Sequence, residues 1–257
     1  MAKEPTLWTR ANDASSLSTP VIGGAGSDVG SPTFAYSAAK FGNGVSNTVA
    51  VTGKQYSGIA PDLNQGTIGC WVQYLNLTPA NHTDATFWGC LGGFSAPSIA
   101  MSFRTVNNSF FITFHVTGGI YFYLLPTAAD LGFSAAQQLQ YIELTWDATG
   151  LTAGTAIDDT NLATYMQCYS TDSSGVLASR TLTNGTDTYA GGITFGSVQG
   201  AGGTATDLGI VGQNISGVAA NAYVDNLKVW DYHRTLANAR NTFLNERGGL
   251  NDDSMIL

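Results

Sequence analysis

The chain has 257 residues, a length typical of one large domain or two small ones; 44% of the residues are hydrophobic and 11% are charged, and the formal net charge is -8. This apolar content is enough for a sizeable core. No run of Lys or Arg occurs, which excludes a basic nucleic-acid or membrane surface, and no apolar run approaches the roughly 20 residues that span a bilayer.

The domain organisation is inferred from changes along the chain. The first ten residues contain no apolar stretch of signal-peptide length, so we expect no handling by the general export pathway unless a leader has been removed. Residues 1–20 are interpreted as an N-terminal arm and residues 251–257 as a C-terminal tail. Residues 21–250 are predicted to form one domain, because no charged or proline-rich linker interrupts the pattern of strands.

Short apolar runs bounded by Gly, Asn, Asp or Pro recur along this domain. Residues 67–74 and 110–116 alternate apolar and polar side chains, which is typical of strands with one face against a core. The spacing of roughly 8–12 residues between such runs predicts a β-sandwich. The predicted strands are 45–51, 66–75, 85–94, 98–105, 110–117, 119–124, 140–146, 162–170, 193–195, 208–212 and 222–230.

One helix is expected near the C-terminus. Thr235 is a suitable N-cap residue. The residues that follow at helical spacing form one apolar stripe, namely Leu236, Ala239, Phe243 and Leu244. We expect this stripe to cover an edge or end of the sandwich.

Three tryptophans lie inside predicted strands, namely Trp71, Trp146 and Trp230. Each is expected to bury a large area between the two sheets of the sandwich. The three cysteines are odd in number and far apart, so we expect buried free thiols rather than a disulfide framework.

Four segments carry more specific strand motifs. They are residues 40–45 (KFGNGV), 66–72 (GTIGCWV), 141–147 (YIELTWD) and 222–230 (AYVDNLKVW), the last followed by Thr235 and Leu236. In this order they resemble the strand motifs of laminin G-like, concanavalin A-like jelly rolls. The resemblance implies an all-β, two-sheet antiparallel jelly-roll sandwich with one short C-terminal helix. It says little about function, since the family includes lectins, adhesion modules, glycanase domains and viral surface proteins.

Glycoside hydrolysis would need two carboxylates on one face, about 5–10 Å apart. Glu143 has no carboxylate two residues further on, where glycanases of this fold carry one. A pair made from Glu143 and Asp147 stays open, but Asp147 is better explained as the start of a turn over residues 147–150. No metal-binding histidine spacing and no nucleophile elbow is present, so we predict that the chain is not an enzyme.

Calcium is the cofactor that the resemblance suggests, because the fold often binds it through aspartates and backbone carbonyls. Aspartates outnumber glutamates 15 to 3 in this chain, and calcium takes several oxygen ligands at once. The candidate ligands are Asp28, Asp158, Asp159 and Asp225. The alternative is that these aspartates lie in turns and hold no metal.

Aromatic rings on the surface could form a platform on which a sugar stacks. The candidate ligand-binding residues are Trp88, Tyr121, Tyr123, Tyr165, Tyr169 and Tyr189. Residues 121 and 123 share one face of a predicted strand, and residues 165 and 169 share one face of another. The alternative is that these rings belong to the core or to a protein interface.

The surface composition is that of an extracellular protein, whereas the start of the chain carries no export signal. A virion component satisfies both observations, since it is made in the host cytoplasm and then lives outside the cell. We therefore predict a non-enzymatic bacteriophage or viral structural or decoration protein on the surface of a capsid or tail. It would bind other virion proteins, or further copies of itself, through its sheets and its two terminal segments.

The alternative is a secreted or surface carbohydrate-binding, lectin-like module with an extracellular location. The two hypotheses overlap, because a virion protein can also bind host glycans. Neither has a nucleic acid or a membrane as partner. A glycanase is a third hypothesis, and the missing carboxylate pair argues against it.

Overall fold

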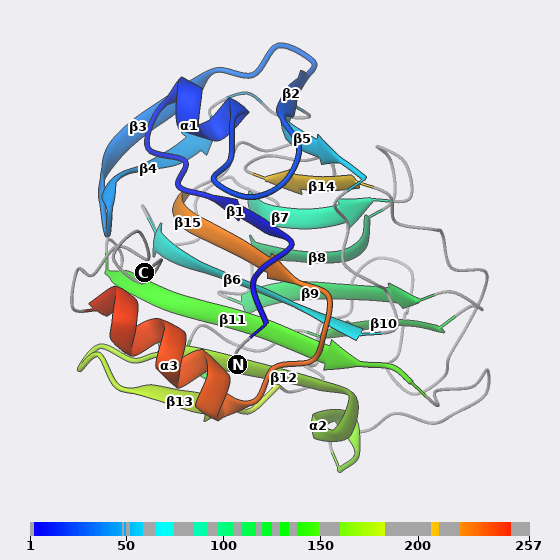
Figure 1. The fold of residues 1–257 in the computed structure, drawn as a ribbon. Coiled ribbons are helices and arrows are strands. Elements are labelled where there is room, and N and C mark those ends of the chain that lie inside the picture. Colours follow the sequence, from blue (N-terminus) through cyan, green and yellow to red (C-terminus); the bar gives the residue numbers. More distant parts are fainter. Residues whose placement is uncertain are drawn as a thin grey trace.

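The described part of the chain forms two stacked antiparallel sheets with a helix on the outer face of one of them (Figure 1). The computed structural model describes residues 3–47, 49, 52–58, 65–74, 85–91, 97–104, 109–116, 120–124, 129–133, 138–149, 160–182, 207–210 and 222–247. The predicted two-sheet, all-β class with one short C-terminal helix is confirmed. The jelly-roll connectivity stays a prediction.

The larger sheet has eight strands within these residues, and α3 lies across it. In spatial order they are β13 (Leu177–Arg180), β12 (Met166–Thr171), β11 (Leu139–Asp147), β6 (Gln65–Tyr74), β15 (Ala222–Trp230), β4 (Gly42–Asn47) and β3 (Phe34–Ala39), with β1 (Leu7–Thr9) also paired to β15. Strands distant in sequence therefore lie side by side at its centre, because β6 pairs with both β11 and β15.

The smaller sheet has seven strands within the described residues. In spatial order they are β10 (Ile120–Leu124), β9 (Ser109–Val116), β8 (Pro97–Arg104), β7 (Ala85–Leu91), β14 (Asp207–Ile210), β5 (Gly53–Ser57) and β2 (Gly26–Val29). Every pairing in both sheets is antiparallel, as far as the described strands show.

The main hydrophobic core lies between the sheets and follows the alternation of the strands. Ile68, Cys70 and Val72 of β6 pack there, as do alternate residues of β11, of which Trp146 is fully buried. Leu208 of β14 belongs to the same cluster and brings in the smaller sheet. The core therefore takes one face of each central strand.

The other face of the larger sheet is also buried, which the simple alternation did not predict. Seven of the nine residues of β11 are buried in succession, so both of its faces are covered. Trp71 packs with the residues beneath the helix α3 (Leu236–Arg247), and Trp230 lines a groove on that same side. The expectation that these two rings lie between the sheets is wrong, whereas it is confirmed for Trp146.

A bulge in β15 explains the position of Trp230. The pairing with β6 shifts register between Asp225 and Lys228, and Asn226 has a positive φ of 50°. The extra residue reverses the orientation of the side chains that follow. Leu227 and Val229 therefore enter the core, and Lys228 and Trp230 point outward.

The segment expected to be an N-terminal arm packs against the sandwich from residue 3 to residue 20. It supplies β1 and a short helix, α1 (Ala14–Ser18). Leu7 of β1 and Leu17 of α1 are fully buried. Asp13 caps α1 by accepting a hydrogen bond from the Ser16 backbone N–H, 2.7 Å away.

A second helix replaces the start of one predicted strand. Residues 162–165, predicted as the beginning of a strand over 162–170, form the single turn α2 (Leu162–Tyr165) before β12. One helical turn places Leu162 and Met166 on the same side, and both are in the core. No helix in the described part of the chain is long and apolar enough to cross a membrane.

Candidate functional site

The candidate site lies beside α3, on the outer face of the larger sheet. Thr235 and Asn238 close the start of the helix reciprocally: the Asn238 N–H donates to Thr235 Oγ1 at 3.4 Å, and the Thr235 N–H donates to Asn238 Oδ1 at 3.1 Å. The buried face of the helix presents Ala239 and Phe243 to the sheet. The predicted helix is confirmed, but Leu244 of the expected apolar stripe is 52% exposed.

Glu246 is the third buried residue of α3, and it anchors the helix through polar contacts. Its carboxylate accepts hydrogen bonds from Trp71 Nε1 at 2.6 Å and from Asn226 Nδ2 at 3.0 Å. Lys228 Nζ lies 3.0 Å from Glu246 Oε1, and both side chains are nearly inaccessible to solvent. Asn226 also accepts a hydrogen bond from the indole of Trp8, so that the bulge connects β1 to the helix.

A second buried ion pair lies where β15 turns into α3. Arg234 Nη1 is 3.4 Å from Glu143 Oε2, and the Tyr141 hydroxyl donates to the same oxygen at 2.7 Å. The guanidinium also stacks on Trp230, with Cζ 3.7 Å from the ring centroid. Burial raises the pKa of the Glu143 carboxyl to about 7, although Arg234 and Tyr141 act in the opposite direction.

Two threonines fix the segment that joins β15 to α3. Thr67 and Thr145 lie opposite each other on β6 and β11, with their hydroxyl oxygens 2.8 Å apart. Thr145 accepts a hydrogen bond from the Arg234 backbone N–H at 2.9 Å, and Thr67 donates to the carbonyl of Tyr232 at 2.8 Å. The central strands of the sheet therefore determine where residues 231–235 lie.

A groove of about 480 Å³ runs between this segment, α3 and the start of the chain, and we call it the α3 groove. Residues 3–5, which we call the strap, form one wall. Val21 and Ile22 continue this wall as an apolar edge, and Val21 is 48% exposed. The deeply buried rings of Trp8 and Trp230 contribute to the lining, and the partly exposed ring of Tyr232 stands beside them.

The opposite wall of the α3 groove is a row of amide side chains. Asn238, Asn241 and Asn245 occur at i, i+3 and i+7 on α3, so they share one face of the helix, and all three line the groove. Asn241 is exposed and Asn245 is partly exposed. Neither amide makes a hydrogen bond to another residue that the structure describes, so both keep donors and acceptors for a ligand.

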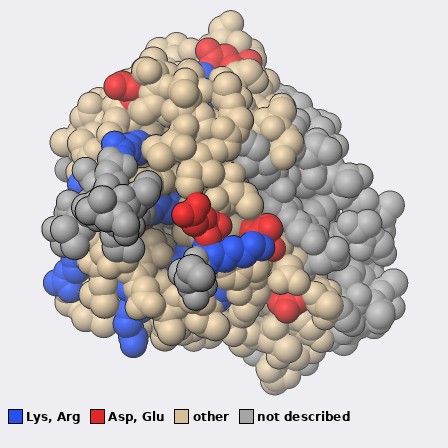
Figure 2. All heavy atoms as spheres, in the orientation of Figure 1, with Lys and Arg blue, Asp and Glu red and all other residues tan. Residues whose placement is uncertain are grey.

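The charges around the groove compensate one another. Figure 2 shows acidic and basic side chains side by side near the middle of this face. Lys3 Nζ of the strap lies 2.6 Å from Asp231 Oδ1, and the Tyr232 hydroxyl donates to the Lys3 carbonyl at 3.3 Å. The strap is thus tied to the segment that it faces.

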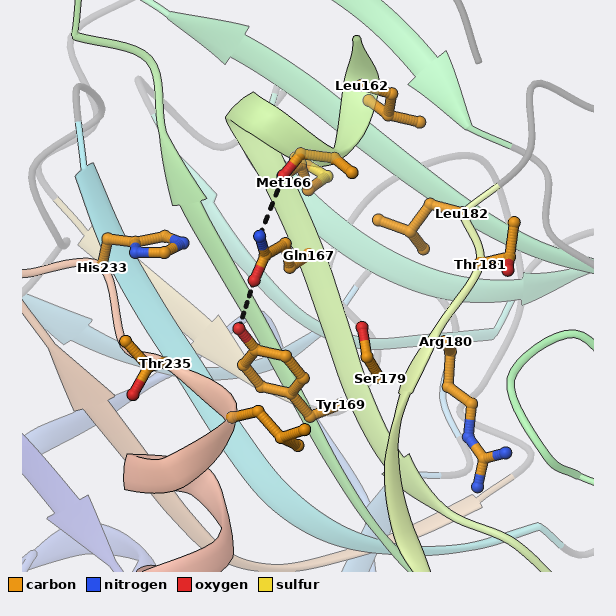
Figure 3. Close-up of a pocket in the computed structure, with 12 residues that line it drawn as sticks. Leu162, Met166, Gln167, Tyr169, Ser179, Arg180, Thr181, Leu182, His233 and Thr235 are labelled. Carbon is orange, nitrogen blue, oxygen red and sulfur yellow. Dashed lines mark hydrogen bonds between the residues drawn. The ribbon is translucent and has the colours of Figure 1, made fainter. Parts of the chain in front are cut away.

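A second pocket of about 440 Å³ lies on the other side of residues 231–235 (Figure 3). Its floor is apolar, made by residues such as Leu162, Met166 and Leu182. The amide of Gln167 is already used, because Nε2 donates to the Ala163 carbonyl at 2.9 Å and Oε1 accepts from the Tyr169 hydroxyl. Ser179, Thr181 and His233 also line this pocket. Among its described residues no side-chain amide is left unused, in contrast to the α3 groove.

His233 is the titratable side chain at the rim of the second pocket, and in Figure 3 its ring faces Gln167. Burial lowers the pKa of the imidazole from its usual 6.5, and the nearby carboxylate of Asp147 opposes that shift. The ring is therefore neutral at pH 7, with one donor and one acceptor.

The structure places only two of the predicted aromatic residues where their side chains are described. Tyr169 borders the second pocket but is 2% exposed, and its hydroxyl is engaged by Gln167. Tyr165 is in α2, so the prediction that these two rings share a strand face is wrong. The remaining candidates lie in β7 and β10, where side chains are not described, or outside the described residues: Trp88, Tyr121, Tyr123 and Tyr189.

The predicted calcium ligands are not brought together where they are described. Asp28 lies in the smaller sheet and pairs with Lys54 at 2.6 Å. Asp225 lies in the larger sheet, where it accepts a hydrogen bond from the Phe41 N–H at 2.8 Å, and burial raises its pKa to about 7. Asp158 and Asp159 are outside the described residues. Among the described side chains, no three His, Cys, Asp or Glu residues gather as metal ligands would.

The proposed catalytic carboxylates of the glycanase hypothesis are occupied with structural contacts. Glu143 has no exposed surface, and Arg234 and Tyr141 contact it. Asp147 accepts a hydrogen bond from the Thr149 N–H at 2.9 Å, as expected for the start of a turn.

Comparisons with solved structures give the fold of the chain. It is similar to the receptor-binding domain of botulinum neurotoxin D, with a TM-score of 0.55 and 11% sequence identity over 95% of this chain and 53% of that chain. For the receptor-binding domain of botulinum neurotoxin type G the values are 0.54 and 8%, over 94% and 51%. The chain thus spans about half the length of these neurotoxin structures.

A third similar structure is domain 4 of AbnA, a GH43 extracellular arabinanase from Geobacillus stearothermophilus, solved in complex with arabinotriose. The TM-score is 0.46 and the identity 11%, over 93% of this chain and 97% of that chain. No protein-family model matches the chain. No curated protein matches it by sequence.

Proposed function

We propose that the chain is a non-enzymatic, carbohydrate-binding, lectin-like module whose ligand occupies the α3 groove. The observation that carries the proposal is the pairing of Tyr232 beside a tryptophan-lined wall with the amides of Asn241 and Asn245, which have no hydrogen-bond partner among the described residues. The fold that the chain shares with receptor-binding domains is consistent with a binding role.

The two walls of the groove suit the two kinds of surface that a sugar presents. A pyranose has an apolar C–H face, which packs on an aromatic ring such as that of Tyr232. Its edge carries hydroxyl groups, each of which both donates and accepts a hydrogen bond. A side-chain amide also offers both functions, so Asn241 and Asn245 can each bind a pair of neighbouring hydroxyls.

The interior position of Glu143 supports a binding role over glycoside hydrolysis. A glycosidase needs two carboxylates that reach the scissile bond from a cleft. Glu143 has no exposed surface and contacts the Arg234 side chain, so a substrate in the groove cannot touch it. Trp8, Lys228 and Arg234 likewise engage in protein contacts that hold the groove in shape.

The test is to screen the full chain against a glycan array and to measure each hit by calorimetry. Tyr232→Ala should weaken the binding of a hit at least tenfold, which is about 1.4 kcal/mol, because it removes the accessible ring. Tyr232→Phe keeps the ring and should stay within about twofold of the original chain. Thermal melting of both variants shows whether the fold is kept.

A folded chain that binds no glycan on the array, or a hit that Tyr232→Ala leaves unchanged, would contradict this assignment of the site. The first result would return the other sequence-based hypothesis, a structural or decoration protein of a virion surface, to first place. None of the comparisons supports that role. Under it, the chain would form multimers or attach to isolated particles while ignoring every glycan.

A further inference from the structure

We infer that the α3 groove takes an uncharged, linear oligosaccharide of two or three sugar units that lies along α3; this rests on the function proposed above. Three features of the groove carry the inference, namely its internal charge compensation, the length of its amide wall, and the apolar character of the facing wall.

The described cations of the groove each have a carboxylate partner in the protein. Lys228 lies 3.0 Å from Glu246, Arg234 lies 3.4 Å from Glu143, and Lys3 lies 2.6 Å from Asp231. An anionic sugar would have to compete with these carboxylates for each cation. Competition for the two inner pairs would also leave a buried carboxylate uncompensated, which is costly.

The remaining charged residue of the groove lining also disfavours an anionic ligand. Glu4 of the strap is exposed and lines the groove. An acidic ligand would therefore approach a negative charge at the entrance, and the formal charge of the whole chain, -8, adds to that repulsion. An uncharged sugar meets no such penalty, and its hydroxyls need only the amides.

The amide wall is longer than one sugar ring. Asn238 and Asn245 are seven residues apart on a helix that rises about 1.5 Å per residue, so the row is about 10 Å long. Asn238 spends its Oδ1 on Thr235, whereas Asn241 and Asn245 make no hydrogen bond to a described residue. The unused amides therefore lie one after the other along the helix axis. They can bind hydroxyls on successive sugar units of an oligosaccharide.

Apart from the charged groups of Lys3 and Glu4, the wall that faces these amides is apolar. Pro5, Val21 and Ile22 present mostly carbon to the groove, and Tyr232 adds a ring. A ligand between the walls would turn an edge with hydroxyls toward the amides and a C–H face toward the apolar wall. A linear oligosaccharide can present these two kinds of surface along its whole length.

The experiment measures affinity against chain length and charge by calorimetry with the full chain. The probes are one to four units of linear β-1,4-linked glucose, xylose, mannose and galactose oligomers, together with β-1,4-linked glucuronate and mannuronate oligomers as acidic counterparts of the glucose and mannose series. Affinity for the best uncharged series should rise at least tenfold from one unit to three and then level off. It should change less than twofold between low and high salt, since no ion pair forms. The acidic counterpart should bind at least tenfold more weakly.

The amide variants locate the sugar units in the groove. Asn245→Ala should remove the gain that comes with the third unit while keeping the affinity for shorter oligomers. Asn241→Ala should weaken all of them severalfold. Arg240→Ala changes the exposed residue next to Asn241 that does not line the groove, and it should leave every affinity unchanged. Thermal melting is the check that all three variants are folded.

The outcomes separate this inference from the function on which it rests. Equal affinity for one and three units would overturn the linear arrangement, and so would an Asn245→Ala variant identical to the original chain. Tighter binding of acidic oligomers, with affinity that falls as salt rises, would overturn the uncharged class. In each of these cases the chain still binds glycans, so the proposed function stands. Binding of no glycan at all removes both.

Discussion

Glu143 is a fully buried carboxylate in the larger sheet. It has no exposed surface, and its carboxylate is contacted by Arg234 at 3.4 Å and by the Tyr141 hydroxyl at 2.7 Å. Oε1 accepts no hydrogen bond from the residues that the structure describes. The burial of a carboxylate with half of its acceptors unused favours the protonated form, which is why the pKa rises from 4.5 to about 7.

This residue predicts how stability depends on pH. Glu143 binds its proton more tightly in the folded chain than in the unfolded one, so its contribution is complete below pH 4.5 and is lost as the pH rises to about 7. The loss is on the order of 3 kcal/mol for a shift of this size. Asp225 acts in the same direction, since burial raises its pKa to about 7 as well.

The measurement is urea unfolding at several pH values between 4.5 and 8. The unfolding free energy of Glu143→Gln should fall less over this range than that of the original chain, because the amide has no proton to lose. Glu4→Gln removes an exposed carboxylate and serves as the control, with an unchanged fall. Equal pH dependence in the original chain and in Glu143→Gln would show that Glu143 stays ionised throughout.

At the scale of elements, α3 owes its position to one buried acidic residue as much as to its apolar face. The sequence pattern assigned Leu244 to the covered stripe, but this side chain is 52% exposed and Glu246 is buried instead. A polar residue takes the covered position because three donors meet there, from Trp71, Asn226 and Lys228. The spacing of residues in the helix cannot predict that these donors surround Glu246, since they come from two strands outside the helix.

Replacement of Glu246 tests this anchor. Glu246→Gln keeps the shape and the acceptor of the side chain but leaves the charge of Lys228 buried and uncompensated. We expect the unfolding free energy to fall by about 3–5 kcal/mol, as measured by urea unfolding. The matched control, Leu244→Ala, alters an exposed residue of the same helix and should stay within about 0.5 kcal/mol.

A double variant tests this ion pair further. Lys228→Met combined with Glu246→Leu removes both charges, and it should recover much of the stability that Glu246→Gln loses. If the double variant is less stable than Glu246→Gln, then the hydrogen bonds from Trp71 and Asn226 hold the helix, and the ion pair contributes little.

The long strands with strong periodicity were predictable, and several of the short ones were not. The predicted strands 66–75, 140–146 and 222–230 agree with β6, β11 and β15 to within two residues at either end. By contrast, β1 has three residues and β13 has four, so neither shows a recognisable alternation. These strands form because neighbouring long strands supply partners, as β15 does for β1.

Part of the candidate site could also have been found in the sequence. Asn238, Asn241 and Asn245 recur at helical spacing opposite the apolar stripe, so the sequence alone predicts a row of amide side chains along one face of the helix. The predicted aromatic candidates do not include the rings that line the groove, Trp8, Trp230 and Tyr232. These rings lie close together because β1 pairs with β15 and because β15 contains a bulge. Both features depend on contacts between residues far apart in the sequence, which local patterns do not show.

At the scale of the whole molecule, the α3 groove exists because the two ends of the described chain come together. Residue 3 lies beside residue 231, joined by the Lys3–Asp231 ion pair and by the hydrogen bond from Tyr232 to the Lys3 carbonyl. The Thr6 N–H continues this contact by donating to the Val229 carbonyl at 2.7 Å. The strap is therefore a wall of the groove that rests on the sandwich without entering its core.

Deletion of residues 1–5 tests this view, because it removes the strap and leaves β1 and Thr6 in place. The Lys3–Asp231 pair is 60% and 41% exposed, so its loss should lower the unfolding free energy by less than about 1 kcal/mol. Glycan affinity should fall at least tenfold in calorimetry, because one wall of the groove is gone. Lys3→Ala keeps the strap but removes the ion pair and the contact of Lys3 Nζ with the Tyr232 ring, whose centroid is 5.4 Å away; it should cost less than threefold. Unchanged affinity in the truncated chain would place the ligand elsewhere, and a large loss of stability would show that the strap is part of the fold itself.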